Sequence, residues 1–173
     1  VDLVVQQVGG DARLTDLGQS LELGAVGGDV VIRHAHHVQL RAVGGDLRLK
    51  WVDGDVTIQA VGADATIREV CGAVRVKRIG ADLYLRNIEG SCIIEQVGSD
   101  LLLNIEFAPE NEYRFRVGSD ILCRAPAGTS ARFVLPAHLS VDLDIEADVT
   151  KSEDGTQQIV TIGEGQALVL IED

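Results

Sequence analysis

Three groups of polar side chains in this sequence have types and spacing that could support chemistry. The first is a set of aspartates that each follow an aliphatic residue and two small residues, as in Val43-Gly-Gly-Asp46. Its members are Asp11, Asp29, Asp46, Asp64, Asp82, Asp100 and Asp120. Carboxylates brought into one ladder could bind Ca²⁺, which takes several oxygen ligands. The calcium-binding nonapeptide G-G-x-G-x-D is not matched, because the aspartate here follows the small pair directly, so we expect a structural ladder of turns.

The second group is basic and recurs four residues after an aspartate of the first group. It consists of Arg33, Lys50, Arg68, Arg86 and Arg124, while Thr15 and Asn104 hold the same position in two other repeats. Such a basic ladder could contact a polyanionic glycan, a membrane surface or the acidic face of another copy of the chain. The competing interpretation, which the sequence favours, is a solvated outer face that keeps a sheet soluble.

Histidines and cysteines form the third group. His34-Ala-His-His37 holds three imidazoles, but no Cys, Asp or Glu at ligand spacing completes a metal site, so we expect a locally rearranged turn. Cys92 and Cys123 fall at inward positions, whereas Cys71 falls in a turn and is the more reactive candidate. No Ser/His/Asp order or phosphate-binding glycine motif is present. We therefore predict no catalytic residues, no cofactor and no metal.

These groups occupy fixed positions of an internal repeat. Repeats begin at Val8, Val26, Val43, Val61, Ile79, Val97 and Val117, which are 18, 17, 18, 18, 18 and 20 residues apart. Counted from that residue, positions 1, 5, 7, 10, 14 and 16 are nearly always apolar. Alternation at 5 and 7, and again at 14 and 16, is the period of a strand with one buried face. Gly-Gly-Asp and Asp-Gly-Asp between the strands form turns, because glycine supplies positive φ and aspartate hydrogen-bonds nearby backbone.

Equivalent strands of successive repeats can stack about 4.8 Å apart and pair in parallel. The sequence therefore predicts an all-β fold: a single parallel β-solenoid (β-helix) with coils of about 18 residues and two main strands per coil. Stacking aligns aliphatic residues in columns, one of which joins Leu14, Ile32, Leu49, Ile67, Leu85, Leu103 and Cys123. A helix is excluded, because the apolar positions would scatter around a helical wheel.

Regular coils are predicted over residues 1–125, and irregular C-terminal coils or a cap of the same domain over residues 126–173. Pro126, Gly128 and Pro136 break the register. Segments 139–149, 158–162 and 166–171 are then predicted strands, with an exposed turn at 151–155. Alternation would place the carboxylates of Asp142, Asp144, Glu146 and Asp148 on one solvated face.

The formal net charge of −12 argues against nonspecific nucleic-acid binding, which needs clustered Lys and Arg. No apolar run is long enough to span a membrane. The sequence contains no methionine, so we expect the natural start, with a signal peptide, anchor or preceding domain, to be missing from it.

The recurring V-G-G-D and D-G-D-V-T-I half repeats, followed by a less regular segment at Leu135-Pro136, resemble the bacterial putative-adhesin family of β-solenoid domains of unknown function. This resemblance covers most of the chain and implies one parallel solenoid in a cell-envelope or extracellular setting. Bactofilin-type polymerising solenoids are a second resemblance, with a similar coil length but without the insistent G-x-D turn.

The pattern as a whole favours a non-enzymatic structural or adhesin-like module that self-associates or binds a surface. Its expected partners are a second copy of the chain, in a dimer or a filament joined through coil edges, and a glycan or cell-envelope surface. One alternative is a polysaccharide-active solenoid enzyme, although such enzymes normally have longer coils with loops protruding from the turns. Another is a ligand-binding or sensor domain detached from a membrane protein.

Overall fold

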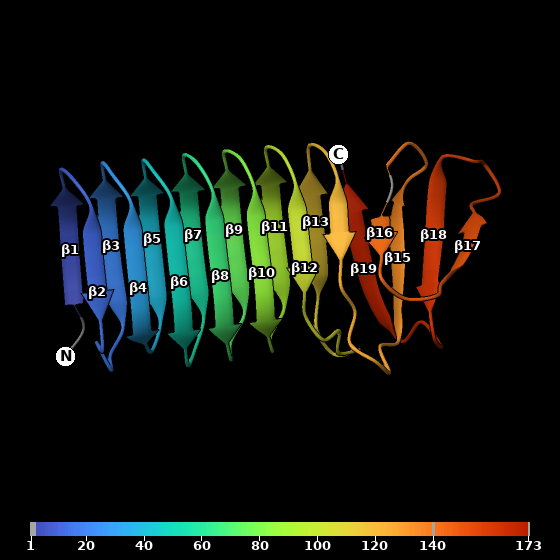
Figure 1. Ribbon diagram of the computed structural model, residues 1–173, viewed down its shortest axis with the longest axis horizontal. Helices are drawn as coiled ribbons and strands as arrows, with labels where there is room; N and C mark the ends of the chain where they lie inside the picture. The colour runs from blue at the N-terminus through green and yellow to red at the C-terminus, as the bar shows by residue number, and fades with distance from the viewer. Residues whose placement is uncertain (1–2, 140, 173) are drawn as a thin grey trace.

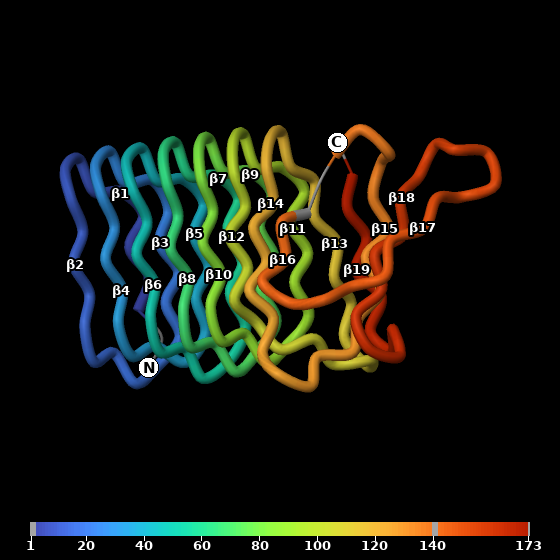
Figure 2. Tube along the Cα trace, turned by 45° about the vertical axis from the view of Figure 1, so that its right-hand side comes forward, coloured from blue at the N-terminus to red at the C-terminus, as the bar shows by residue number. Residues whose placement is uncertain are grey.

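The computed structural model describes residues 3–139 and 141–172, and in these residues it is a β-solenoid without helices. Two sheets face each other along the length of the molecule, as the ribbon and the tube show (Figures 1 and 2). Sheet A contains, in spatial order, β1 (Leu3–Val8), β3 (Leu21–Val26), β5 (Val38–Val43), β7 (Val56–Val61), β9 (Val74–Ile79), β11 (Cys92–Val97), β13 (Tyr113–Val117), β19 (Ala167–Glu172), β15 (Ala131–Pro136), β18 (Gln157–Ile162) and β17 (Asp148–Lys151). Sheet B contains β2 (Ala12–Thr15), β4 (Val30–Ala35), β6 (Leu47–Val52), β8 (Ala65–Val70), β10 (Leu83–Ile88), β12 (Leu101–Asn104), β14 (Ile121–Cys123) and β16 (Val141–Leu143).

The predicted stacking register is confirmed. Each strand of the regular coils pairs in parallel with the strand one coil away, so that Leu49 lies between Ile32 and Ile67 in sheet B. Val43 lies in the same way between Val26 and Val61 in sheet A. These aliphatic columns form the core, and no charged residue is buried among the described residues.

Simple alternation stops before the end of each six-residue strand of the regular coils. In β6 the side chains of Leu47, Leu49 and Val52 are buried, whereas Lys50 and Trp51 both lie outside the core. In sheet B the second outward residue takes a left-handed conformation, with φ from 50° to 59° at Asp16, His34, Trp51, Glu69 and Asn87. Non-glycine residues adopt this region at a cost of order 1–3 kcal/mol each. The left-handed residue turns the chain so that the apolar residue after it points back to the core.

Close stacking, and not positive φ, explains the repeated glycines. Gly44 and Gly62 do not have a positive φ, so the prediction that glycine supplies it in these turns is wrong. A Cβ added to Gly62 would lie 2.4 Å from the carbonyl oxygen of Gly44, one coil below. A side chain there would push the two coils apart.

The two irregular coil lengths are absorbed mainly in a turn and a loop, and the pairing of β11 with β13 also shifts by one residue between Ile94 and Val97. The 17-residue coil has only His36 and His37 between the buried Ala35 and Val38, where a full coil has three turn residues. The 20-residue coil has a loop between β12 and β13, in which the hydroxyl of Tyr113 accepts a hydrogen bond from Ala108 N at 2.9 Å. Burial raises the pKa of Tyr113.

Two of the three predicted C-terminal strands are confirmed, by β18 and β19. Strand β15 was not predicted, and Pro136 is its last residue. The prediction of one strand over 139–149 is wrong, because β16 spans only Val141–Leu143 and residues 144–147 lie outside strands. The predicted alternation is nevertheless kept, because the four acidic side chains are exposed whereas Leu143, Ile145 and Ala147 are partly buried against the core. Asp144 Oδ1 also accepts a hydrogen bond from Ala125 N at 3.0 Å.

The last strand completes the stack. β19 lies between β13 and β15 and pairs in parallel with both. β15 then pairs with β18, and β18 with β17, in antiparallel fashion, so sheet A ends in a hairpin (Figure 1). The predicted exposed turn at 151–155 connects β17 to β18, and Asp154 Oδ1 accepts hydrogen bonds there from Ser152 and Thr156.

Gly62→Ala should destabilise the fold by about 1–3 kcal/mol, because overpacking two coils forces the backbone to shift. Urea unfolding would measure this loss. Gly10→Ala is the matched control, since a Cβ at Gly10 would meet nothing within 4 Å. Equal stability of the two variants would contradict the role of close stacking.

Candidate functional site

The basic ladder lies on the outer face of sheet B. Arg33, Lys50, Arg68 and Arg86 pair residue to residue across β4, β6, β8 and β10. Successive cations are therefore about 4.8 Å apart along the stack at the level of the backbone. Asn104 follows Arg86 in the same row, and Arg124 lies just beyond the end of β14. Four of the five predicted basic residues thus form one continuous row.

A second set of cations faces this row across a groove of about 380 Å³. The groove is lined by Arg13, Arg33, Arg48, Lys50 and Arg68, together with Val31, Ile32, Leu49 and Thr66. No carboxylate is among its described lining residues. We call this site the cationic groove. The sequence reasoning missed Arg13 and Arg48, although each lies two residues before the basic position and so shares its face by strand alternation.

Most cations of the groove have no acidic partner. Arg48 Nη2 lies 3.3 Å from Asp46 Oδ2, but Arg13, Arg33, Lys50 and Arg68 have no carboxylate within 4.0 Å in the part of the chain that the structure describes. Three arginines on the outer face of sheet A do have partners: Arg75, Arg114 and Arg116 pair with Asp55, Glu112 and Glu172 at 4.0, 3.5 and 3.0 Å. Arg41, Arg78 and Arg132 on that sheet have no described carboxylate within 4.0 Å.

Aromatic rings hold two of the groove cations. Lys50 Nζ lies 3.6 Å from the centroid of the Trp51 ring, and Arg68 Cζ lies 4.9 Å from that of Tyr84. Each contact is a cation–π interaction, worth about 0.5–1 kcal/mol at exposed sites. Arg68 Nε is shielded from solvent and has no hydrogen-bond partner. The groove therefore contains a fixed guanidinium with one unused donor.

The left-handed residues form a second row beside the basic one. His34 stacks on Trp51 with 4.5 Å between ring centroids and 7° between planes, and His34 Nδ1 lies 2.6 Å from Asp16 Oδ1. A ring stacked this closely leaves no room for an ammonium on the same face, so Lys50 occupies the other face of Trp51. Both faces of this indole are covered.

The histidines do not converge on one point. His36 and His37 are at the shortened turn in edge-to-face contact, with centroids 4.4 Å apart, whereas His34 lies on β4. His37 Nδ1 accepts a hydrogen bond from Asp55 N at 2.9 Å. Within residues 3–139 and 141–172, no group of three or more His, Cys, Asp or Glu residues is placed to hold a metal ion.

The seven predicted aspartates form an inter-coil hydrogen-bond ladder at one edge of the solenoid. Each carboxylate except that of Asp120 accepts a hydrogen bond from the backbone N–H of the aspartate one coil further on. The pairs are Asp29 N to Asp11 Oδ1 (2.9 Å), Asp46 N to Asp29 Oδ1 (2.9 Å), Asp64 N to Asp46 Oδ1 (3.3 Å), Asp82 N to Asp64 Oδ1 (3.1 Å), Asp100 N to Asp82 Oδ1 (3.1 Å) and Asp120 N to Asp100 Oδ1 (3.2 Å). The sequence suggested a bond within each turn, but these bonds join successive turns.

Three cysteines differ sharply in environment. Cys92 and Cys123 are completely buried, as predicted, and burial raises the pKa of each thiol to about 12. Cys71 is exposed in a turn. Slight burial and the carboxylates of Glu89 and Asp53 raise the pKa of Cys71, so its surroundings do not activate the thiol.

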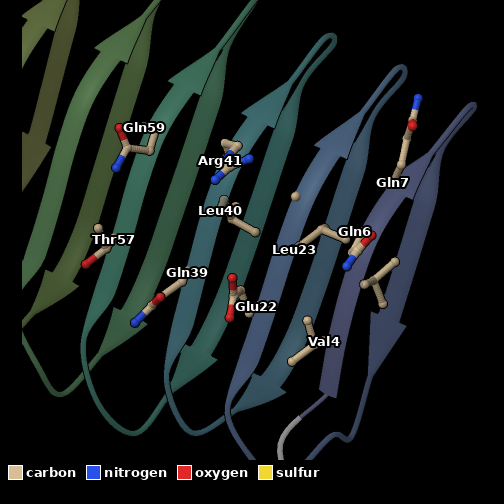
Figure 3. A pocket seen from close by; sticks show the side chains of 12 residues that line it. Val4, Gln6, Gln7, Glu22, Leu23, Gln39, Leu40, Arg41, Thr57 and Gln59 are labelled. Carbon is tan, nitrogen blue, oxygen red and sulfur yellow. The ribbon is translucent and has the colours of Figure 1, made fainter.

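A second depression lies on the outer face of sheet A, near β1, and has a volume of about 640 Å³. Figure 3 shows the amides of Gln6, Gln39 and Gln59 around it, with Glu22 and Arg41. Gly24 allows β3 to approach β1 closely, because a Cβ there would clash with the backbone carbonyl of Gln6. One acid and one base line this depression, so its formal charge is balanced, unlike that of the cationic groove.

Comparisons with family models, with curated proteins and with solved structures find no match for this chain. The resemblance to the bacterial adhesin-type domains therefore stays a prediction. In the described part of the chain, no helix is long and apolar enough to cross a membrane.

Replacing Asp64 by alanine should cost about 1 kcal/mol, because Asp82 N loses its acceptor. Asp64→Asn keeps an oxygen acceptor and should be nearly neutral in urea unfolding. Millimolar calcium should leave the melting temperature of the wild type unchanged. A calcium-dependent rise that vanished in Asp64→Asn would show instead that the ladder binds a cation by mass action.

Proposed function

We propose that this chain is a non-enzymatic binding module, a stiff β-solenoid that attaches to an anionic surface or polymer through the cationic groove. One observation carries this proposal: five cations line a single groove without a lining carboxylate, on a chain whose formal net charge is −12. A clustered positive field of this kind concentrates anionic partners and raises their association rate.

The electrostatics of the groove favour a ligand. Like charges about 4.8 Å apart repel by about 0.9 kcal/mol per pair in a water-like dielectric. On sheet A, nearby carboxylates relieve this repulsion at Arg75, Arg114 and Arg116. In the cationic groove, only Arg48 has such relief. Anionic groups supplied by a ligand would offset the remaining repulsion.

Two features support binding over catalysis. The described lining of the cationic groove contains no carboxylate, histidine or thiol to act as a general acid, base or nucleophile. The sheet A depression has Glu22 as its single carboxylate, whereas glycoside hydrolysis uses a pair. The short turns of the regular coils add no protruding loops around either site.

The triple variant Arg33→Ala, Lys50→Ala, Arg68→Ala should lose at least about tenfold in affinity for polyanions. Suitable probes are immobilised heparin, polygalacturonate, single-stranded DNA and phosphatidylserine vesicles, at about 50 mM and about 200 mM salt. The wild type should bind one or more probes, more weakly at the higher salt.

The control Arg75→Ala, Lys77→Ala, Arg114→Ala changes the net charge equally but lies on sheet A. It should bind like the wild type. A wild type that bound no probe, or a control that lost as much affinity as the groove variant, would refute the proposal.

Self-association is a second candidate function, supported by the free edges of the first coil. β1 and β2 are the end strands of their sheets, each with one described neighbour (Figure 1). Leu3 N donates a hydrogen bond to Ser20 O. By strand alternation, the N–H of Val4 then points to the free edge of β1. The side chain of Val4 is 58% exposed. Unpaired strand edges invite pairing with another chain.

Val4→Pro should weaken any self-association while leaving each protomer folded, because it removes an edge donor that β3 does not use. Sedimentation at several concentrations would measure the oligomer, and circular dichroism would report the fold. A dimer or filament unaffected by Val4→Pro, or a wild type that stayed monomeric at high concentration, would exclude association through this edge.

A further inference from the structure

We propose that the ligand of the cationic groove is a linear acidic polysaccharide, with a carboxylate or sulfate on successive sugars, lying along the solenoid axis. This inference rests on the proposed function and names its ligand class. The groove crosses β2, β4, β6 and β8, so its long direction follows the stack of coils.

The spacing of the cations matches such a chain. β2, β4 and β8 each supply one groove cation, Arg13, Arg33 and Arg68, and β6 supplies both Arg48 and Lys50. Each of these coils therefore presents at least one positive charge, and neighbouring coils are about 4.8 Å apart along the axis. An extended chain of pyranose rings advances by nearly the same distance per sugar. One anionic group per sugar can then meet one coil, without bending of either partner.

The shape of the groove suits sugar rings. The small side chains of Val31 and Thr66 alternate with Arg13 and Arg48 along the same row of the face. They leave low points between longer cationic side chains, and Val31 offers an apolar contact to ring C–H groups. Ligand grooves commonly combine such apolar lining with a few fixed polar groups. Arg68 is such a group, because Tyr84 holds its guanidinium and its Nε lacks a partner.

Two other anionic macromolecules fit less well. Single-stranded nucleic acid stacks its bases on free aromatic faces. Here His34 and Lys50 cover the two faces of Trp51, and Arg68 lies over the ring of Tyr84. An anionic membrane would press on a broad surface, whereas these cations line a recess. Trp51, at 39%, is the single exposed large hydrophobic residue described on the outer face of sheet B.

The fluorescence of Trp51, which is the one tryptophan of the chain, gives a direct readout. Galacturonate oligomers of increasing length should bind with affinity that rises up to about four sugars, the span of β2 to β8, and then levels off. The single sugar should not bind, and neither should fully methyl-esterified oligomers of the same length. Oligomers of carrageenan, a sulfated galactan without carboxylates, form a second arm, which separates sulfate from carboxylate as the preferred group.

A double variant, Val31→Phe with Thr66→Phe, fills the groove without changing its charge. It should reduce the affinity for the oligomers at least about tenfold. Thr57→Phe, on the outer face of sheet A, is the control and should bind normally. Near-normal circular dichroism of all variants would show that the fold is kept.

The outcomes separate the two proposals. If vesicles or DNA bind through Arg33, Lys50 and Arg68 but acidic oligosaccharides do not, the anion-binding function stands and the polysaccharide inference is overturned. Binding of oligosaccharides that is independent of length, or insensitive to the filled groove, also overturns the inference. If no polyanion binds at all, both proposals fail.

Discussion

Parallel backbone pairing between coils, at a nearly constant offset of 18 residues, is the interaction on which the structure depends. It forces every residue to lie beside its counterpart in the next coil, so a position that is favourable once is favourable along the whole stack. For this reason the aliphatic columns, the close contacts of glycine with the backbone of the next coil and the hydrogen bonds from N–H to carboxylate recur along the stack. Departures in coil length lie mainly in the turn at His36 and His37 and in the loop that Tyr113 anchors. Within the strands, the pairing of β11 with β13 shifts by one residue between Ile94 and Val97.

The same pairing places like charges beside one another, and the two sheets relieve the resulting repulsion to different extents. Stacking brings like cations together on both outer faces. Sheet A pairs several of its arginines with carboxylates, whereas sheet B holds Lys50 and Arg68 against aromatic rings and leaves their charge uncompensated. A row of uncompensated cations on an acidic protein is costly unless something else uses it. This asymmetry between the faces is the main support for the proposal that sheet B binds an anionic partner.

Local backbone strain contributes to that assignment. The left-handed column, with Trp51 at φ 59°, lets two adjacent side chains point outward in each coil. Alternation alone would have directed Trp51 into the core. The indole instead lies beside Lys50, with His34 stacked on its other face. The strain is tolerated because neighbouring coils fix the backbone on both sides, and its result is a positioned ammonium beside the groove.

The sequence alone determined the solenoid, its register and the columns of Asp64 and Lys50, because period-2 alternation and an 18-residue repeat are local signals that stacking simply copies. It also located the outward row of Arg33 to Arg86. The tertiary structure decided what depends on contacts between coils: that Asp64 bonds the next turn, that Gly62 is required by the coil below, and that Arg13 and Arg48 close a groove with Arg68. It alone showed that β19 returns to pair with β13 and β15, since no repeat signal connects strands so distant in sequence. Stacking distances and long-range strand order are set by packing of the whole chain, which one repeat cannot encode.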